Sequence, residues 1–178
     1  MVSIEIKNSV IEEINSLIGA KKTPEILQSY FWLELESGIW LLNETQFNFL
    51  QTHSSPELEK KLKYAGIFIG KIRRNFGLSI ESLYNLQPCI SRYIIIKGKT
   101  LQKYLYGKPI TVTINKNNIE NLDLKKIIVM TPERHPIGIS RFTILEEKKE
   151  GDKTIISLKL EPITDLGMFL RKERTMFE

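Results

Sequence analysis

The 178-residue chain has little of what marks secreted or membrane proteins. Its apolar runs are far shorter than the roughly 20 residues that a membrane-spanning helix needs. Its N-terminus carries acidic residues early and lacks the basic-then-apolar pattern of a signal peptide. A single cysteine, Cys89, excludes an internal disulfide and is typical of a reducing compartment. We therefore expect a soluble cytoplasmic protein without membrane contact.

Groups for metal binding and catalysis are also scarce. One cysteine and two distant histidines, His53 and His135, are too few for a zinc site. The first 91 residues contain no aspartate, and no glycine-rich cofactor loop precedes a helix there. We therefore expect a protein that is not an enzyme, with no catalytic residues, no metal and no cofactor.

The net charge of +5 is unevenly distributed along the chain. Residues 1–91 carry 9 Lys and Arg against 10 Glu, a net charge of −1. Residues 92–178 carry 17 Lys and Arg against 11 Asp and Glu, a net charge of +6. A basic surface of this kind either attracts polyanions or is simply solvated, and charge alone leaves both interpretations open.

The stretch from residue 93 to residue 110 predicts a strand, a turn and a short helix. The run Tyr93–Ile96 is typical of a buried strand, and Gly98 gives the backbone freedom to turn. Apolar side chains share one helical face: Leu101, Tyr104 and Leu105. Gly107 ends the helix. Four lysines on the other face or at the two ends suggest a surface for polyanions: Lys97, Lys99, Lys103 and Lys108.

The first half mixes helical and strand patterns. We expect a helix over 10–18 that begins with a capping box at Ser9 and Glu12. A hairpin over 30–42 and a short helix capped by Asn43 and Gln46 follow. After this short helix we expect a strand within 63–74, a turn at 75–77 and a helix starting at Ser79.

The second half is mostly strands. Strand patterns occupy 110–114, 126–130, 137–145 and 154–160, and 146–153 resembles a charged hairpin tip. Short, closely spaced strands favour a small barrel-like β domain. We therefore predict an α+β protein: an N-terminal antiparallel sheet with flanking helices over 1–91, then a small β-barrel-like domain over 92–178.

Several segments carry a resemblance to a known domain. Gly98, Leu101 and Tyr104–Gly107 resemble the glycine turn and helix of a PUA domain, and Pro136–Ile139 is similar to its Pro-hydrophobic-Gly signature. The ending Thr164–Glu173 resembles the last segment of the Nip-seven family of ribosome-biogenesis proteins, where an α/β domain precedes a PUA domain. The likeness extends into the first half at three places: Trp32–Leu42, Gly66–Lys71 and Leu78–Leu86.

The resemblance implies RNA binding through the PUA domain, with a role in pre-rRNA processing and large-subunit assembly. Archaeal relatives are associated with single-stranded U- or AU-rich RNA and with modulation of the exosome. The resemblance thus implies that ribosome-assembly proteins or the exosome are partners of the N-terminal domain. It also implies that the protein is a monomer. An archaeal member, which the Ile- and Lys-rich composition favours, would be cytoplasmic, and a eukaryotic one nucleolar.

Six residues are the expected RNA contacts. The family's C-terminal basic cluster corresponds to Arg171 and Lys172, with Arg174 as a third member, and the charge pattern adds Lys97, Lys99 and Lys103. Lysine offers a point charge to phosphate, and arginine donates two parallel hydrogen bonds. The nearby aromatic residues are assigned to the core rather than to base stacking, since their spacing explains an apolar role: Tyr104, Tyr106 and Phe169.

Two other functions remain open. The protein could be an interaction adaptor whose apolar N-terminal hairpin docks on a partner and whose basic half only keeps it soluble. It could also be an accessory subunit of an RNA-modifying enzyme. The basic tip at Lys71, Arg73 and Arg74 is the second candidate RNA contact.

Overall fold

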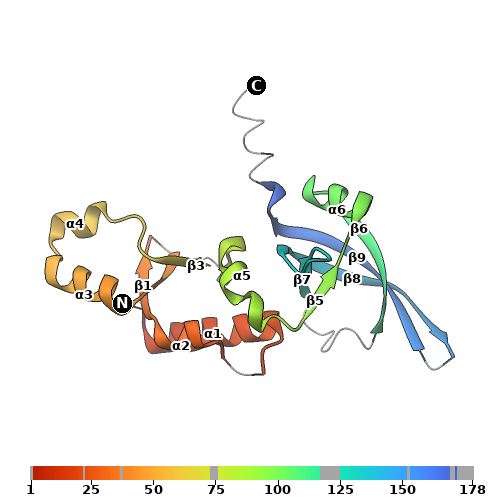
Figure 1. The fold of residues 1–178 in the computed structure, drawn as a ribbon, viewed down its shortest axis with the longest axis horizontal. Helices are drawn as coiled ribbons and strands as arrows, with labels where there is room; N and C mark the ends of the chain where they lie inside the picture. Colours follow the sequence, from red (N-terminus) through yellow and green to blue (C-terminus); the bar gives the residue numbers. More distant parts are fainter. Residues whose placement is uncertain are drawn as a thin grey trace. The chain divides into compact units, whose positions relative to one another are not determined.

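The computed structural model describes residues 2–21, 23–36, 38–72, 76–116, 125–151, 153–168 and 171. Contacts group the chain into two compact units. The first contains Met1–Ser16 and Ala20–Cys89, and the second contains Leu17–Gly19 and Ile90–Glu178. Figure 1 shows the order of the elements along the chain.

The first unit contains a four-stranded antiparallel sheet with helices, as the sequence predicted. The sheet has the order β1-β2-β3-β4, and its strands are β1 (Phe31–Leu35), β2 (Gly38–Leu42), β3 (Ile67–Ile72) and β4 (Phe76–Leu78). The helices are α1 (Ile4–Ile18), α2 (Glu25–Ser29), α3 (Glu44–His53), α4 (Pro56–Lys61) and α5 (Ile80–Leu86), with a 3₁₀ turn at Gln87–Cys89.

Local capping chemistry explains where these helices begin. The predicted capping box is present at α3, where Asn43 accepts from the Gln46 N–H and the Gln46 side chain accepts from the Asn43 N–H. Ser79 caps α5, also as predicted. The predicted cap at Ser9 is wrong, because α1 begins one and a half turns earlier and Ser3 accepts from the Ile6 N–H at 3.3 Å.

Three short elements differ from the sequence prediction. The helices α2 and α4 were not predicted, because five or six residues are too few for an apolar period to become visible. The structure shows what starts α4: Ser55 accepts from the Leu58 N–H at 3.1 Å, and Pro56 follows in the first turn. Residues 76–77 belong to β4 rather than to a turn.

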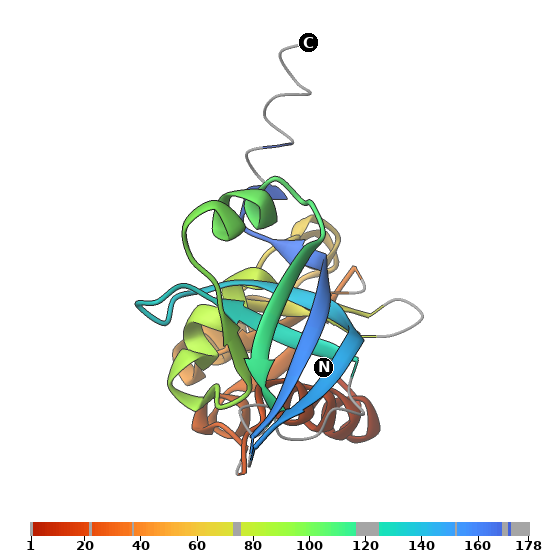
Figure 2. The ribbon, with the colours of Figure 1, turned by 90° about the vertical axis from the view of Figure 1, so that its right-hand side faces the viewer.

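The second unit contains a five-stranded mixed sheet and the helix α6 (Gly98–Leu105). The sheet has the order β5-β7-β8-β9-β6, in which only β5 and β7 pair in parallel. Its strands are β5 (Tyr93–Ile95), β6 (Ile110–Asn115), β7 (Lys126–Met130), β8 (Pro136–Glu150) and β9 (Lys153–Asp165). Figure 2 shows β6, β9 and β8 side by side, with α6 near one end of β6.

The β8–β9 hairpin is longer than predicted. Pairing continues from Gly138 opposite Asp165 to Glu150 opposite Lys153, so most of the expected charged tip is strand. The strand pattern was hidden there because residues 143–150 are all exposed and show no buried alternation. Register shifts at Ile139–Ser140 and Ile144–Glu146 mark two irregularities in the pairing.

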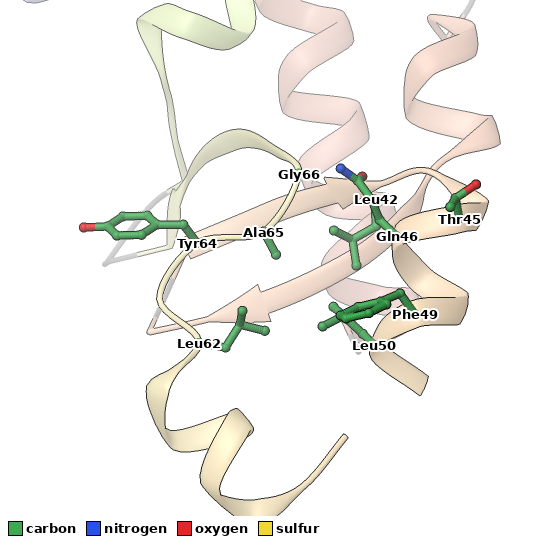
Figure 3. Close-up of a pocket in the computed structure, with 9 residues that line it drawn as sticks. All are labelled: Leu42, Thr45, Gln46, Phe49, Leu50, Leu62, Tyr64, Ala65 and Gly66. Carbon is green, nitrogen blue, oxygen red and sulfur yellow. The ribbon is translucent and has the colours of Figure 1, made fainter. Parts of the chain in front are cut away.

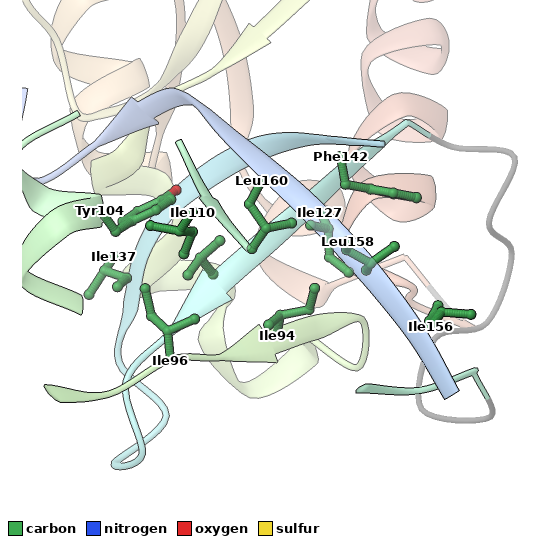
Figure 4. Close-up of a cluster of buried hydrophobic side chains, with 11 residues drawn as sticks. Ile94, Ile96, Tyr104, Ile110, Ile127, Ile137, Phe142, Ile156, Leu158 and Leu160 are labelled. Atoms are coloured by element: carbon green, nitrogen blue, oxygen red, sulfur yellow. The ribbon is translucent and has the colours of Figure 1, made fainter. Parts of the chain in front are cut away.

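A cluster of eleven buried side chains forms the core of the second unit (Figure 4). It draws on every strand of the sheet and on Tyr104 of α6. Leu101 packs against the same cluster. The observed architecture is therefore α+β, as the sequence predicted.

Three further observations bear on the function. Within the described ranges, no helix is both long and apolar enough to span a membrane. Among the same residues, no three His, Cys, Asp or Glu side chains gather where they could hold a metal ion. Cys89 is half-buried and carries a free thiol.

Candidate nucleic-acid interface

The helix α6 is fixed to the sheet by its apolar face. Tyr104 is fully buried, whereas Leu101 and Leu105 are half-buried. The Ser140 hydroxyl donates to the Tyr104 hydroxyl oxygen at 2.9 Å. Burial raises the pKa of Tyr104 well above its ordinary value, so this hydroxyl is neutral at physiological pH. The core role assigned to Tyr104 from the sequence is confirmed.

The opposite side of α6 is basic and exposed. Lys97, Lys99 and Lys103 are all exposed, as is Lys108 beyond the end of the helix. Lys99 and Lys103 stand four residues apart, a spacing at which like charges destabilise a helix by a few tenths of a kcal/mol. An eight-residue helix is about 12 Å long, so the lysines line a short ridge.

The N-terminal end of α6 favours anions. Lys97 occupies the N-cap position and makes no side-chain cap, and the first turn contains no acidic residue. The helix dipole places partial positive charge at this end, which adds to the charges of Lys97 and Lys99 instead of offsetting them. Gly98 has φ +56°, and no described atom lies within 4 Å of the place of a Cβ. Backbone N–H groups at the start of a helix point outward, where they can donate to an anion.

The C-terminal end of α6 is held by a Schellman motif. The Gly107 N–H donates to the Tyr104 carbonyl at 2.8 Å, and the Lys108 N–H donates to the Lys103 carbonyl at 3.1 Å. Gly107 has φ +73°, which a side chain would disfavour. The Tyr106 N–H donates to the Gln102 carbonyl at 3.1 Å. The backbone from residue 103 to residue 108 is therefore fixed.

Arg171 reaches this same end of α6. Its guanidinium forms two hydrogen bonds with the Asp165 carboxylate, at 3.1 and 2.9 Å, and also donates to the carbonyl of Leu105. Asp165 is buried, whereas the Arg171 side chain is 37% exposed. Hydrogen bonding to Asp165 raises the pKa of Arg171. Arg171 thus joins the segment after β9 to a carbonyl that the helix leaves unpaired.

Gly167 allows this close approach. A Cβ at Gly167 would lie 1.8 Å from the Leu105 carbonyl oxygen, a distance that no real side chain tolerates. The contact carries the chain after β9 directly past the last turn of α6. The name "helix clamp" is used below for the contacts of Asp165, Gly167 and Arg171 with this turn.

The structure brings together only part of the predicted site. Arg171 meets the C-terminal end of α6, but its guanidinium has internal partners, and its contact with RNA stays a prediction. Lys172, Arg174 and Phe169 lie outside the described residues. In the first unit, Lys71 is exposed on β3, whereas Arg73 and Arg74 also lie outside the described residues.

Two exposed residues at this end of α6 were not among the six expected RNA contacts. Lys108 is exposed beside the helix end, and Tyr106 is 61% exposed. The core role expected for Tyr106 is therefore wrong. The apolar positions Leu101, Tyr104 and Leu105 recur at i, i+3 and i+4, and the same period places residue 106 on the side of Lys99 and Lys103.

The charge of the surrounding sequence is of one sign. From Arg92 to Ile119 the chain holds six Lys or Arg and no Asp or Glu. The carboxylate of Asp165, which belongs to β9, is engaged with Arg171. The exposed side of α6 therefore presents positive charge that nearby sequence does not neutralise.

The first unit has a site of a different kind. A pocket of about 360 Å³ opens between β2, α3 and the segment before β3 (Figure 3). Its lining is mostly apolar, and the exposed rings of Phe49 and Tyr64 belong to it. It is lined by Leu42, Thr45, Gln46, Phe49, Leu50, Leu62, Tyr64, Ala65 and Gly66. None of these lining residues is Asp, Glu, His, Lys or Cys.

Comparison with known proteins agrees with the geometry of the second unit. The family model described as the UPF0113 PUA domain matches residues 92–174. The chain therefore carries a C-terminal PUA domain, a class of domain that binds RNA and is generally non-catalytic. No curated protein matches the chain.

Proposed function

We propose that this protein binds single-stranded RNA through the exposed side of α6 and acts without catalysis. The observation that carries the proposal is a ridge of lysines on a PUA domain, with no acidic residue in the surrounding sequence. Lysine ammonium groups neutralise phosphates and release counterions, which yields affinity with a steep dependence on salt. Lys97, Lys99 and Lys103 are the proposed contacts. Lys172 and Arg174 remain proposed contacts beyond the described residues.

The proposed biological role is pre-rRNA processing and assembly of the large ribosomal subunit. It rests on the resemblance of Thr164–Glu173 and of the first half to the Nip-seven family. U- or AU-rich RNA is the proposed ligand, and assembly proteins or the exosome are the proposed partners of residues 1–91. An archaeal monomer would act in the cytoplasm.

A titration with RNA tests the proposal. The protein should bind a single-stranded U-rich oligonucleotide more tightly than a duplex of equal length. Each phosphate contact adds about 0.7 to the slope of log affinity against log salt. Replacing Lys97, Lys99 and Lys103 with glutamine should therefore flatten the slope by up to about 2 and weaken binding at low salt.

A matched variant separates the site from the overall charge. Lys21, Lys61 and Lys63 are exposed lysines of the first unit, and their replacement by glutamine removes the same charge. This control should keep nearly all of the affinity. Equal losses in the two triple variants would contradict the assignment to α6. No binding of RNA by the unaltered protein at low salt would contradict the proposed function.

The adaptor is the second candidate function, and the pocket of the first unit favours it. Phe49 is 57% exposed and Tyr64 is 76% exposed at its rim. An apolar pocket with exposed aromatic rings suits the insertion of an apolar side chain from a protein partner. The two functions are compatible, because the lysines and the pocket belong to different units. The adaptor alone would show no affinity for RNA in the titration above.

A further inference from the structure

We propose that Tyr106 is a stacking platform for one RNA base, with Lys103 and Lys108 contacting the phosphates on either side. This inference rests on the proposed RNA binding and adds the residue that recognises a base. Phosphate contacts alone would hold any polyanion equally well. A ring at the same place would let the protein prefer a strand that carries unpaired bases.

The ring of Tyr106 is available, in contrast to that of Tyr104. Tyr106 is 61% exposed, whereas Tyr104, two residues earlier, is completely buried. A tyrosine side chain has only two rotatable bonds, so ordering it on a ligand costs little entropy. Every base has a flat face that stacks on such a ring, whatever its sequence.

The backbone under Tyr106 is rigid. The Schellman motif fixes residues 103 to 108 through the hydrogen bonds of Gly107 and Lys108, and the Tyr106 N–H is itself bonded to Gln102. Arg171 holds the Leu105 carbonyl from the other side. A platform on a fixed backbone is preorganised, which reduces the entropy lost on binding.

The same motif brings two lysines to this end of the helix. In a Schellman motif, the third residue from the helix end and the second residue beyond the cap commonly form an apolar contact. Here these positions are Lys103 and Lys108, joined by a backbone hydrogen bond of 3.1 Å, and both are exposed. Two positively charged lysines thus stand where an apolar contact is usual, and they flank Tyr106 in sequence. Phosphates on both sides of a stacked base would balance those charges.

A pair of ligands separates stacking from charge. One is a single-stranded U-rich RNA, and the other is an abasic ribose-phosphate strand of the same length and charge. The protein should bind the RNA about 5- to 100-fold more tightly than the abasic strand, the range expected for one stacked base. Tyr106→Ala should lose most of this preference and keep its affinity for the abasic strand and its salt slope. Tyr106→Phe and Tyr106→Trp, which retain a ring, should keep the preference.

Tyr84→Ala is the matched control, since Tyr84 is an exposed tyrosine of α5 in the first unit. It should leave both affinities unchanged. An affinity of Tyr106→Ala for RNA within twofold of the unaltered protein would overturn the inference. An equal loss of affinity for RNA and for the abasic strand would also overturn it, because a stacking ring acts only on bases. Failure of the unaltered protein to bind either strand would instead overturn the proposed function.

Discussion

The two sides of α6 differ in what holds their side chains. On the inner side, Tyr104 is enclosed by the core and hydrogen-bonded to Ser140, so its position is set by neighbours on every side. On the outer side, Lys99, Lys103 and Tyr106 are exposed. The comparison shows that one short helix separates the residues that stabilise the domain from those that can serve a ligand.

The largest expected effect on stability comes from removing the buried ring of Tyr104. Tyr104→Ala should lower the free energy of unfolding by about 3–5 kcal/mol, because it leaves a cavity in the core of the second unit. Lys103→Ala, one residue away on the outer side, should change it by less than about 0.5 kcal/mol. Urea denaturation of the two variants measures both. Similar losses in the two variants would contradict the division of α6 into a stabilising side and a ligand side.

The helix clamp should have the next largest effect. Arg171→Ala removes the cation from the buried Asp165 carboxylate and should cost about 1.5–3 kcal/mol, the range for hydrogen bonds to charged groups. Arg171→Lys keeps the charge but loses the two parallel hydrogen bonds, so an intermediate loss is expected.

A second substitution identifies the cause of that loss. Asp165→Asn, combined with Arg171→Ala, should recover part of the stability, because no unpaired charge then remains buried. Thermal denaturation of the single and double variants measures the coupling. Strictly additive losses would show that the two side chains act independently.

The smallest expected effect on stability comes from the ionisation of Tyr104 at alkaline pH. Burial raises the pKa of Tyr104 in the folded protein, whereas in the unfolded chain it ionises near the ordinary value of about 10. The folded form therefore retains the proton more tightly, and stability is lost as the pH rises above about 10, by up to about 1.4 kcal/mol per pH unit. Tyr104→Phe has no such proton. The free energy of unfolding of this variant, measured by urea denaturation, should fall less steeply between pH 10 and 11 than that of the unaltered protein. Equal slopes for the two proteins would contradict the raised pKa of Tyr104.

Short-range signals made much of the fold predictable. The capping box at Asn43 and Gln46, the cap at Ser79 and the stop at Gly107 each depend on a few neighbouring residues, and all three are present. Errors occurred where the pattern was too short or too exposed. The helices α2 and α4 have only five and six residues, too few to show an apolar period. The outer part of β8 is exposed throughout, so it shows no alternation of buried and exposed residues.

The candidate site was only partly predictable, because its exposure depends on tertiary contacts. The helical period correctly assigned Tyr104 to the core and Lys99 and Lys103 to the surface. The same period places Tyr106 on the side of Lys99, so assigning Tyr106 to the core from its aromatic character was an error that the helical spacing itself could have corrected. The helical period could not reveal the internal partners of Arg171, one of which, Leu105, lies 66 residues earlier in the chain.

The long separation between Leu105 and Arg171 has a consequence for synthesis. A ribosome makes α6 and β6 before β9, but β6 pairs with β9, and Arg171 follows β9. During translation, the lysines and Tyr106 therefore leave the ribosome well before the residues that anchor them. Only a chain extended through Arg171 can complete the contacts at the end of α6, so this surface reaches its final form after β9 has been made.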